Sequence, residues 1–229
     1  MNKVSSADDR ATRLRDVAAR NTAAGCSRDA ASIAPGVTLL RGYAATAPLC
    51  AAIDAIAAAA PFRHLTTPGG GCMSVAMTNC GTWGWHSDAR GYRYLTHDSA
   101  SGVPWPTMPA SFRALAAEAA AAGGFAGFEP DCCLINRYAV GAQMGAHRDF
   151  DELEMRHPIV SVSIGLPAVF LWYGATRKGP PLRVPVVDGD VVVFGGSARA
   201  GYHGVRRLAA PEPGGRATER YNLTFRRAR

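Results

Sequence analysis

The sequence predicts a single α+β domain built on a double-sheet barrel or jelly roll. Three observations lead to this fold class. The chain of 229 residues suits one domain with a sizeable core, and two full domains would be cramped. Its first half carries two Ala-rich helical segments, and the region after residue 130 is a series of short apolar strands separated by turns. Helices followed by a run of strands are typical of an α+β domain.

Both helices are defined by where they end. The first is predicted at residues 47–60, and Pro61 ends it because proline cannot continue the backbone hydrogen bonding. The second is predicted at residues 109–122, with Phe112, Leu115 and Ala119 on one face, and Gly123-Gly124 stops it.

Short apolar runs define the strands. They are predicted at residues 37–40, 132–138, 159–166, 168–173, 182–187, 190–194 and 221–227. The run at 159–166 alternates apolar and small polar residues, as expected of a strand with one buried face. Asp188-Gly189, between two of the runs, is typical of a two-residue turn and predicts a β-hairpin there.

Composition and the N-terminus bear on location and partners. Residues 1–35 are rich in Ala, Arg, Ser and Asp, so we expect a poorly ordered extension with at most a loose helix. This segment lacks the apolar core of a secretory signal, which favours the cytoplasm, and no run of 18 apolar residues predicts a membrane span. The net charge of +7 fits a polyanionic partner and simple solubility equally well.

The six cysteines show no metal-binding spacing. We expect all of them to be reduced thiols, and two that are adjacent in a predicted strand should point to opposite faces of it. They are Cys26, Cys50, Cys72, Cys80, Cys132 and Cys133.

The stretch AHRDFD at residues 146–151 contains His-Arg-Asp, which also occurs in the catalytic loop of protein kinases. A kinase would need an Asn five residues after the Asp, but Glu154 stands there. The sequence also has no DFG motif and no phosphate loop with G-x-G-x-x-G spacing. The kinase interpretation therefore fails.

The same stretch fits a metal site. On a strand, His147 and Asp149 project from one face and Arg148 points away, so the first two can reach one ion. A non-haem Fe(II) oxygenase uses two His and one carboxylate, and His203 is the candidate for the second His. The spacing alone is a weak motif, because His86-Ser87-Asp88 repeats it. That copy has no apolar strand around it, and we interpret it as a surface loop.

The strand near the C-terminus strengthens the metal interpretation. Its alternation places Arg220, Asn222, Thr224 and Arg226 on one face and three apolar residues on the other. Two arginines that face the inside of a barrel need an anionic partner, and a dicarboxylate suits two guanidinium groups. A strand with one solvated face remains the alternative explanation.

Several longer stretches resemble bacterial AlkB, the family of 2-oxoglutarate- and Fe(II)-dependent dioxygenases that remove alkyl lesions from nucleic-acid bases. They are TPGG at 67–70, MSVAMTNCG at 73–81, LINRY at 134–138, HxDxDE at 147–152 and RYNLTFR at 220–226. The similarity runs from about residue 36 to the end, in one domain of residues 36–229. It implies a double-stranded β-helix (cupin-like jelly roll) with flanking N-terminal helices and a nucleotide-recognition lid at about 67–94.

The resemblance also implies roles for individual residues. His147, Asp149 and His203 would bind Fe(II), with O₂ as the second cosubstrate. The two carboxylates of 2-oxoglutarate would be bound by Arg220 and Arg226, assisted by Asn136, Tyr138 and Asn222. Substrate contacts would come from Thr67, Met73, Ser74, Trp85, Tyr92, Asp151 and Arg177. In these roles Asp151 accepts a hydrogen bond from the exocyclic amine of a flipped base, and His147 stacks beside that base.

The implied activity is oxidative demethylation of 1-methyladenine and 3-methylcytosine by a cytoplasmic monomer. The substrate would be single-stranded or double-stranded DNA, with RNA left open. The chain departs from the family pattern at Gly71, His86-Ser87-Asp88, Trp172-Tyr173 and Phe194, which puts the fine substrate preference in doubt. Three alternatives remain: a hydroxylase of protein or small molecules with the same cosubstrate, a non-catalytic nucleic-acid-binding module, and a metal-storing cupin-like protein.

Overall fold

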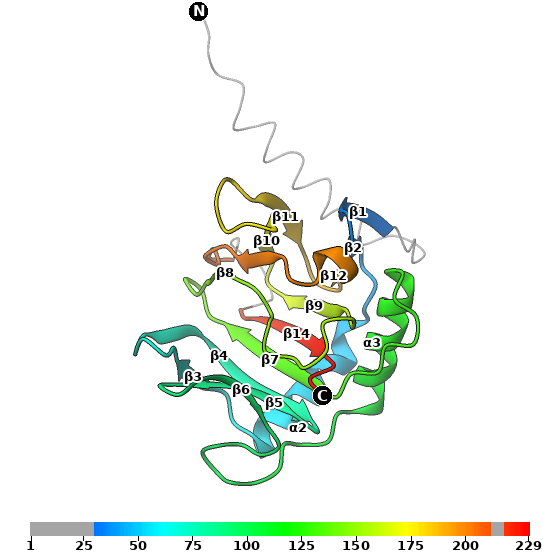
Figure 1. Ribbon diagram of the computed structural model, residues 1–229. Helices are drawn as coiled ribbons and strands as arrows, with labels where there is room; N and C mark the ends of the chain where they lie inside the picture. Colours follow the sequence, from blue (N-terminus) through cyan, green and yellow to red (C-terminus); the bar gives the residue numbers. More distant parts are fainter. Residues whose placement is uncertain (1–29, 212–217) are drawn as a thin grey trace, which may run out of the picture.

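The computed structural model describes residues 30–211 and 218–229 (Figure 1). Two helices and three antiparallel sheets make up this part of the chain. The helices are α2 (Thr46–Ala59) and α3 (Ala110–Ala122). The strands are β1 (Ala30–Ala34), β2 (Val37–Leu40), β3 (Arg63–Thr66), β4 (Cys72–Gly81), β5 (Gly84–Asp88), β6 (Gly91–Leu95), β7 (Cys132–Tyr138), β8 (Met144–His147), β9 (Ile159–Gly165), β10 (Ala168–Gly174), β11 (Leu182–Val186), β12 (Val191–Phe194), β13 (Tyr202–Val205) and β14 (Arg220–Arg226).

Two of the sheets form the jelly roll that the sequence predicts. The larger has eight strands in the order β1-β2-β12-β9-β14-β7-β4-β3, and the smaller has four in the order β11-β10-β13-β8. A separate hairpin, β5-β6, lies beside the β3-β4 end of the larger sheet (Figure 1). Because neighbours in each sheet come from distant parts of the chain, residues far apart in sequence meet between the sheets.

The eight-stranded sheet has an apolar core on each face. On one face, α2 and α3 pack through residues such as Ile53 and Phe112 against Leu223 and Phe225 of β14. On the other face, Leu134 and further apolar side chains pack against the four-stranded sheet. The predicted helices are confirmed to within one residue at each end.

Strand β14 has the alternation that the sequence predicts. It lies between β7 and β9, with Asn222 opposite Asn136 on one side and opposite Ser163 on the other. Leu223 and Phe225 face the helices, so the arginine-bearing face is directed toward the four-stranded sheet. The adjacent cysteines in β7 also point to opposite faces, since Cys133 and Cys132 belong to different clusters of buried residues.

The predicted hairpin at Asp188-Gly189 is wrong. Strand β11 pairs with β10 in the smaller sheet, whereas β12 pairs with β2 and β9 in the larger one, so the turn carries the chain between sheets. Asp188 explains why: its carboxylate accepts hydrogen bonds from the Gly165 amide and the Thr46 hydroxyl, 2.7 Å away in each case. These long-range contacts replace the cross-strand pairing that a hairpin would make.

The loop assigned to His86-Ser87-Asp88 is also wrong. These residues belong to β5, and His86 and Ser87 are buried. The His86 ring lies 3.4 Å from Asp88 and 3.3 Å from the Ser99 hydroxyl, so polar partners rather than apolar neighbours accommodate it. Because this strand carries polar residues, it shows no apolar run by which it could be predicted.

The extension predicted at residues 1–35 is corrected in part, because residues 30–34 form β1 and pair with β2. The loose helix predicted there and Cys26 lie outside the described residues. The cysteines at 50, 72, 80, 132 and 133 are free thiols, as predicted. No helix in the described ranges combines the length and apolar character needed to cross a membrane.

Candidate iron and 2-oxoglutarate site

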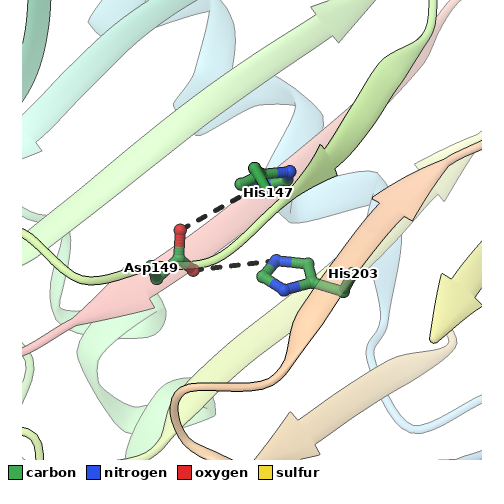
Figure 2. A group of neighbouring side chains, drawn as sticks. All are labelled: His147, Asp149 and His203. Carbon is green, nitrogen blue, oxygen red and sulfur yellow. Dashed lines mark ion pairs between the residues drawn. The ribbon is translucent and has the colours of Figure 1, made fainter. Parts of the chain in front are cut away.

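The two predicted histidine ligands lie opposite each other in the four-stranded sheet. His147 ends β8 and His203 is its direct partner in β13, which places their rings 4.4 Å apart. Asp149 follows two residues after β8 and completes the group shown in Figure 2. Its two carboxylate oxygens lie 3.9 Å from His147 Nε2 and 3.8 Å from His203 Nε2. One ligand atom from each residue lies within 4.8 Å of the others.

Backbone carbonyls orient both imidazoles. The Nδ1 atom of His147 lies 2.9 Å from the Gly145 carbonyl, and that of His203 lies 3.1 Å from the Gly201 carbonyl. Because a carbonyl only accepts, each Nδ1 carries the proton and each Nε2 presents its lone pair to the centre of the group. This is the tautomer that a metal ligand requires.

The electrostatic environment favours cation binding by the group. Burial alone would raise the pKa of Asp149, but Arg226 and the two histidines lower it well below the usual range, so the carboxylate stays ionised. Burial, followed by the charge of His147, lowers the pKa of His203 to about 4 and keeps it neutral. Asp149 Oδ2 is buried with no hydrogen-bond partner among the described residues, as expected of an atom that awaits a metal ion.

Two arginines on β14 extend the site. Arg226 donates to Asp149 Oδ1 at 2.9 Å, so it lies at the metal end. Arg220 is six residues earlier, about 20 Å away at strand spacing, and forms no ion pair among the described residues. Its guanidinium contacts the Ser163 hydroxyl at 3.0 Å and lies 5.8 Å from the centre of the Tyr138 ring.

These arginines retain hydrogen-bonding capacity. Arg220 Nε, Arg226 Nη1 and Asn136 Oδ1 are buried without a hydrogen-bond partner in the described part of the chain. Buried polar atoms normally have partners, so the site has room for a polar ligand between the sheets. A molecule with a carboxylate at each end matches two buried guanidinium groups, and the donor set therefore fits 2-oxoglutarate as well as iron.

All fifteen residues that the sequence analysis singled out line one cavity of about 510 Å³ between the two sheets and the β5-β6 hairpin. They are His147, Asp149, His203, Asn136, Tyr138, Arg220, Asn222, Arg226, Thr67, Met73, Ser74, Trp85, Tyr92, Asp151 and Arg177. The volume is in the usual range for small-molecule sites. The residues span 160 positions of sequence, and the jelly-roll topology brings them together.

Aromatic side chains of the hairpin lie over the mouth of the cavity. The rings of Trp85 and Tyr92 stack with their centres 5.5 Å apart, and Tyr92 is 46% exposed. Trp85 Nε1 donates to Asp151 Oδ2 at 2.9 Å, which joins the hairpin to the chain two residues after Asp149. A planar base could enter between such rings and the metal group.

Comparison with known proteins places this geometry in a family. Residues 36–226 match the model of the 2OG-Fe(II) oxygenase superfamily. The alpha-ketoglutarate-dependent dioxygenase AlkB of Salmonella typhimurium is 48% identical over 198 residues, which cover 86% of this chain and 92% of the relative. The chain belongs to the AlkB family of 2OG-Fe(II) oxygenases. It is therefore an alpha-ketoglutarate-dependent dioxygenase that uses Fe(II) and 2-oxoglutarate.

Two further AlkB-family relatives are more distant. The solved structure titled "The structure of OsALKBH1" superposes with a TM-score of 0.75 at 26% identity, covering 87% of this chain and 100% of that one. The mouse protein named nucleic acid dioxygenase ALKBH1 is 32% identical over 126 residues, which are 55% of this chain and 32% of that protein.

Two of the departures from the family pattern, Trp172 and Phe194, pack beside His203. Trp172 is buried, and its ring packs 5.7 Å from Phe194 and 6.4 Å from His203. The Trp172 indole fills the space beside Gly201 that is free because glycine has no side chain. A Cβ atom at this position would collide with the indole. Of Trp172, Tyr173 and Phe194, only Phe194 lines the cavity. Trp172 therefore packs behind His203, and Phe194 forms part of the cavity wall.

Sequence reasoning missed several residues of the site. Ser161, Ser163 and Thr224 line the cavity, and the two serines hold Asn222 and Arg220. Their positions in alternating strands carried this signal, because they lie on the faces opposite the helix-facing residues. Arg148, predicted to point away, lies at the exposed rim of the cavity with its guanidinium 4.4 Å from the Phe150 ring. Strand β8 ends at His147, so strict alternation no longer applies there.

Proposed function

We propose that the protein demethylates N-methylated bases in nucleic acid by oxidation, coupled to conversion of 2-oxoglutarate to succinate. The observation that carries this proposal is the single cavity that joins three features. The His147, Asp149 and His203 group lies at its centre, two buried arginines lie along one wall, and the stacked Trp85 and Tyr92 rings lie at its mouth.

In this proposal, different residues of the cavity bind iron and 2-oxoglutarate. His147, Asp149 and His203 would hold Fe(II), which supplies the oxidation chemistry when it is bound with 2-oxoglutarate and oxygen. Arg226 would bind the cosubstrate carboxylate nearer the metal, and Arg220 the far one. Asn136, Tyr138 and Asn222 would line its path, and the two sheets exclude water from it.

The lid residues would select a base that has left its helix. Trp85 and His147 would flank the base, and Asp151 would accept a hydrogen bond from its exocyclic amine. Thr67, Met73, Ser74, Tyr92 and Arg177, all at the cavity, would hold the neighbouring strand. Extruding a base costs a few kcal/mol, least where pairing is already lost. Methyl groups on the pairing edge, as in 1-methyladenine and 3-methylcytosine, weaken pairing and suit this route.

The relatives support a nucleic-acid substrate, and the printed name of the mouse relative states one. The preference for DNA, with RNA as the open alternative, is part of the proposal. We also propose that residues 36–229 act as one catalytic domain of a cytoplasmic monomer. Net charge of +7 is consistent with a polyanionic partner.

The test is product formation on defined lesions. The protein is supplied with iron, ascorbate and 2-oxoglutarate together with single-stranded oligonucleotides that contain 1-methyladenine or 3-methylcytosine. We expect succinate, formaldehyde and the unmodified base in equal amounts, and no base product from an unmethylated oligonucleotide.

Two variants make the test specific. Asp149→Ala should abolish turnover with the fold retained, and His97→Ala, at an exposed histidine outside the site, should behave as wild type. Hydroxylation of a peptide or small molecule, with no activity on any methylated nucleic acid, would replace the proposal with the hydroxylase alternative.

A further inference from the structure

The lid hairpin is attached to the metal-binding loop at two adjacent points. Besides the bond from Trp85 to Asp151, the Tyr94 hydroxyl of β6 donates to Glu152 Oε1 at 2.6 Å. Asp151 and Glu152 lie two and three residues after Asp149 in the chain. The second attachment is buried: Tyr94 is 5% exposed, and the Glu152 side chain is 1% exposed.

Glu152 also lies between two buried arginines. Its carboxylate is 3.0 Å from Arg199 Nη2 and 3.3 Å from Arg226 Nε. Arg199 in turn donates to the backbone carbonyl of Asp149 at 2.9 Å. The four charges of Arg199, Arg226, Asp149 and Glu152 balance to zero, so this buried cluster is neutral without any ligand.

The cluster determines which part of Arg226 remains for the cosubstrate. Asp149 takes Nη2 and Glu152 faces Nε, so two sides of the guanidinium group are held by protein carboxylates. Nε has no hydrogen bond and only its ion pair with Glu152, and Nη1 has neither a hydrogen bond nor an ion pair among the described residues. Because the guanidinium group is planar, contacts on two of its sides fix its orientation, and this orientation also fixes the direction of Nη1.

We propose that Glu152 is a positioning residue, which orients Arg226 for 2-oxoglutarate and, through Tyr94, couples order in the lid hairpin to cosubstrate binding. The inference rests on the proposed role of Arg226 toward the cosubstrate. Glu152 does not line the cavity, so it acts through Arg226 and Tyr94 and does not contact the substrate base. Coupling of this kind is reciprocal: the cosubstrate orders the hairpin, and an ordered hairpin strengthens cosubstrate binding.

Two variants separate the two halves of the proposal. Glu152→Gln keeps an oxygen that can accept from Tyr94 but removes the charge that holds Arg226. Tyr94→Phe keeps every charge and removes only the hydroxyl that joins the hairpin to Glu152. A matched control is Tyr221→Phe, because the Tyr221 hydroxyl donates to Glu219 at 2.7 Å in the same kind of pair, away from the cavity.

The readouts need neither turnover nor nucleic acid. Affinity for 2-oxoglutarate is measured by calorimetry on the Mn(II)-loaded protein, and order in the hairpin is measured as amide hydrogen exchange over residues 84–95, with and without the cosubstrate. In the wild type we expect the cosubstrate to slow exchange in the hairpin. Glu152→Gln should weaken 2-oxoglutarate binding by about 10-fold or more, because the buried ion pair that holds Arg226 Nε is lost.

Tyr94→Phe should still bind 2-oxoglutarate, with a several-fold loss of affinity, but the cosubstrate should no longer slow exchange in its hairpin. Tyr221→Phe should match the wild type in both measurements. The inference is overturned if Glu152→Gln binds 2-oxoglutarate normally, or if the cosubstrate slows exchange in Tyr94→Phe as much as in the wild type. If Glu152→Gln does not fold, the Tyr94→Phe result alone decides. If no methylated lesion is demethylated, the proposed substrate is wrong. The measurements of 2-oxoglutarate affinity and hydrogen exchange do not depend on that result.

Discussion

The two arginines of β14 should respond in opposite ways to the same substitution. Arg220 is 2% exposed and has no carboxylate partner among the described residues, and burial lowers its pKa. Arg226 is equally buried but pairs with Asp149 and Glu152, which raise its pKa even though burial alone would lower it. Arg220 therefore carries an unbalanced charge in the free protein, whereas Arg226, together with Arg199, balances the two carboxylates.

Replacement by Met tests this difference. In the metal-free protein, Arg220→Met should leave the free energy of unfolding unchanged or raise it by about 1 kcal/mol, since an unpaired buried charge is removed. Arg226→Met should lower it by about 3–5 kcal/mol, because it leaves the buried Asp149 carboxylate without its arginine partner and Glu152 with Arg199 alone. Both variants should bind 2-oxoglutarate about 10- to 100-fold more weakly, corresponding to loss of a charge-assisted contact of about 1.5–3 kcal/mol.

Urea unfolding of the metal-free variants measures the first effect, and calorimetry with Mn(II) measures the second. Arg220→Lys is the matched control: it keeps the charge but not the planar pair of donors, and should recover part of the affinity. The reasoning is refuted if Arg220→Met destabilises the protein as much as Arg226→Met, or if it binds 2-oxoglutarate as the wild type does.

Three further predictions concern the metal group and its support. His147→Ala should lose Co(II) binding in equilibrium dialysis while its far-ultraviolet circular dichroism stays that of the wild type. In the metal-free protein, the low pKa of His203 means that between about pH 6.5 and 4 this residue is protonated in the unfolded chain but not in the folded one. The free energy of unfolding should therefore fall as the pH drops through this range. Urea titrations should show a smaller fall for His203→Asn than for the wild type. Gly201→Ala should lower the free energy of unfolding by about 1–3 kcal/mol through a collision with Trp172, and the added change Trp172→Leu should restore part of it; an additive double variant would contradict this.

The sequence predicted the cavity walls well because they are built from alternating strands. In β14 the pattern of arginine and apolar residues is sufficient to show which side faces the ligand, and the register with β7 and β9 follows from burial. The pairing of His147 with His203 could not be derived in this way. It depends on which strands become neighbours in the four-stranded sheet, and local sequence carries no such information.

Three features were missed for physical reasons. The Asp188-Gly189 turn has the residues of a hairpin, but the Asp188 carboxylate accepts long-range hydrogen bonds from Thr46 and Gly165, and these decide where the following strand goes. Strand β4 is buried along most of its length, so it shows no alternation of apolar and polar residues by which it could be recognised. The pairing of Glu152 with Arg199 and Arg226 was likewise invisible, since buried charges that neutralise one another are far apart in sequence.

The division of the site between the two sheets has a consequence for the lifetime of the protein. The proposed metal ligands His147 and His203 belong to the four-stranded sheet, and the arginines belong to the eight-stranded one. A cosubstrate that contacts both sheets resists their separation, and at a concentration 100 times its dissociation constant it adds about 2.7 kcal/mol to the stability of the native state. Resistance to proteolysis would then follow the supply of iron and 2-oxoglutarate, so that the enzyme persists where it can act and is cleared where it cannot.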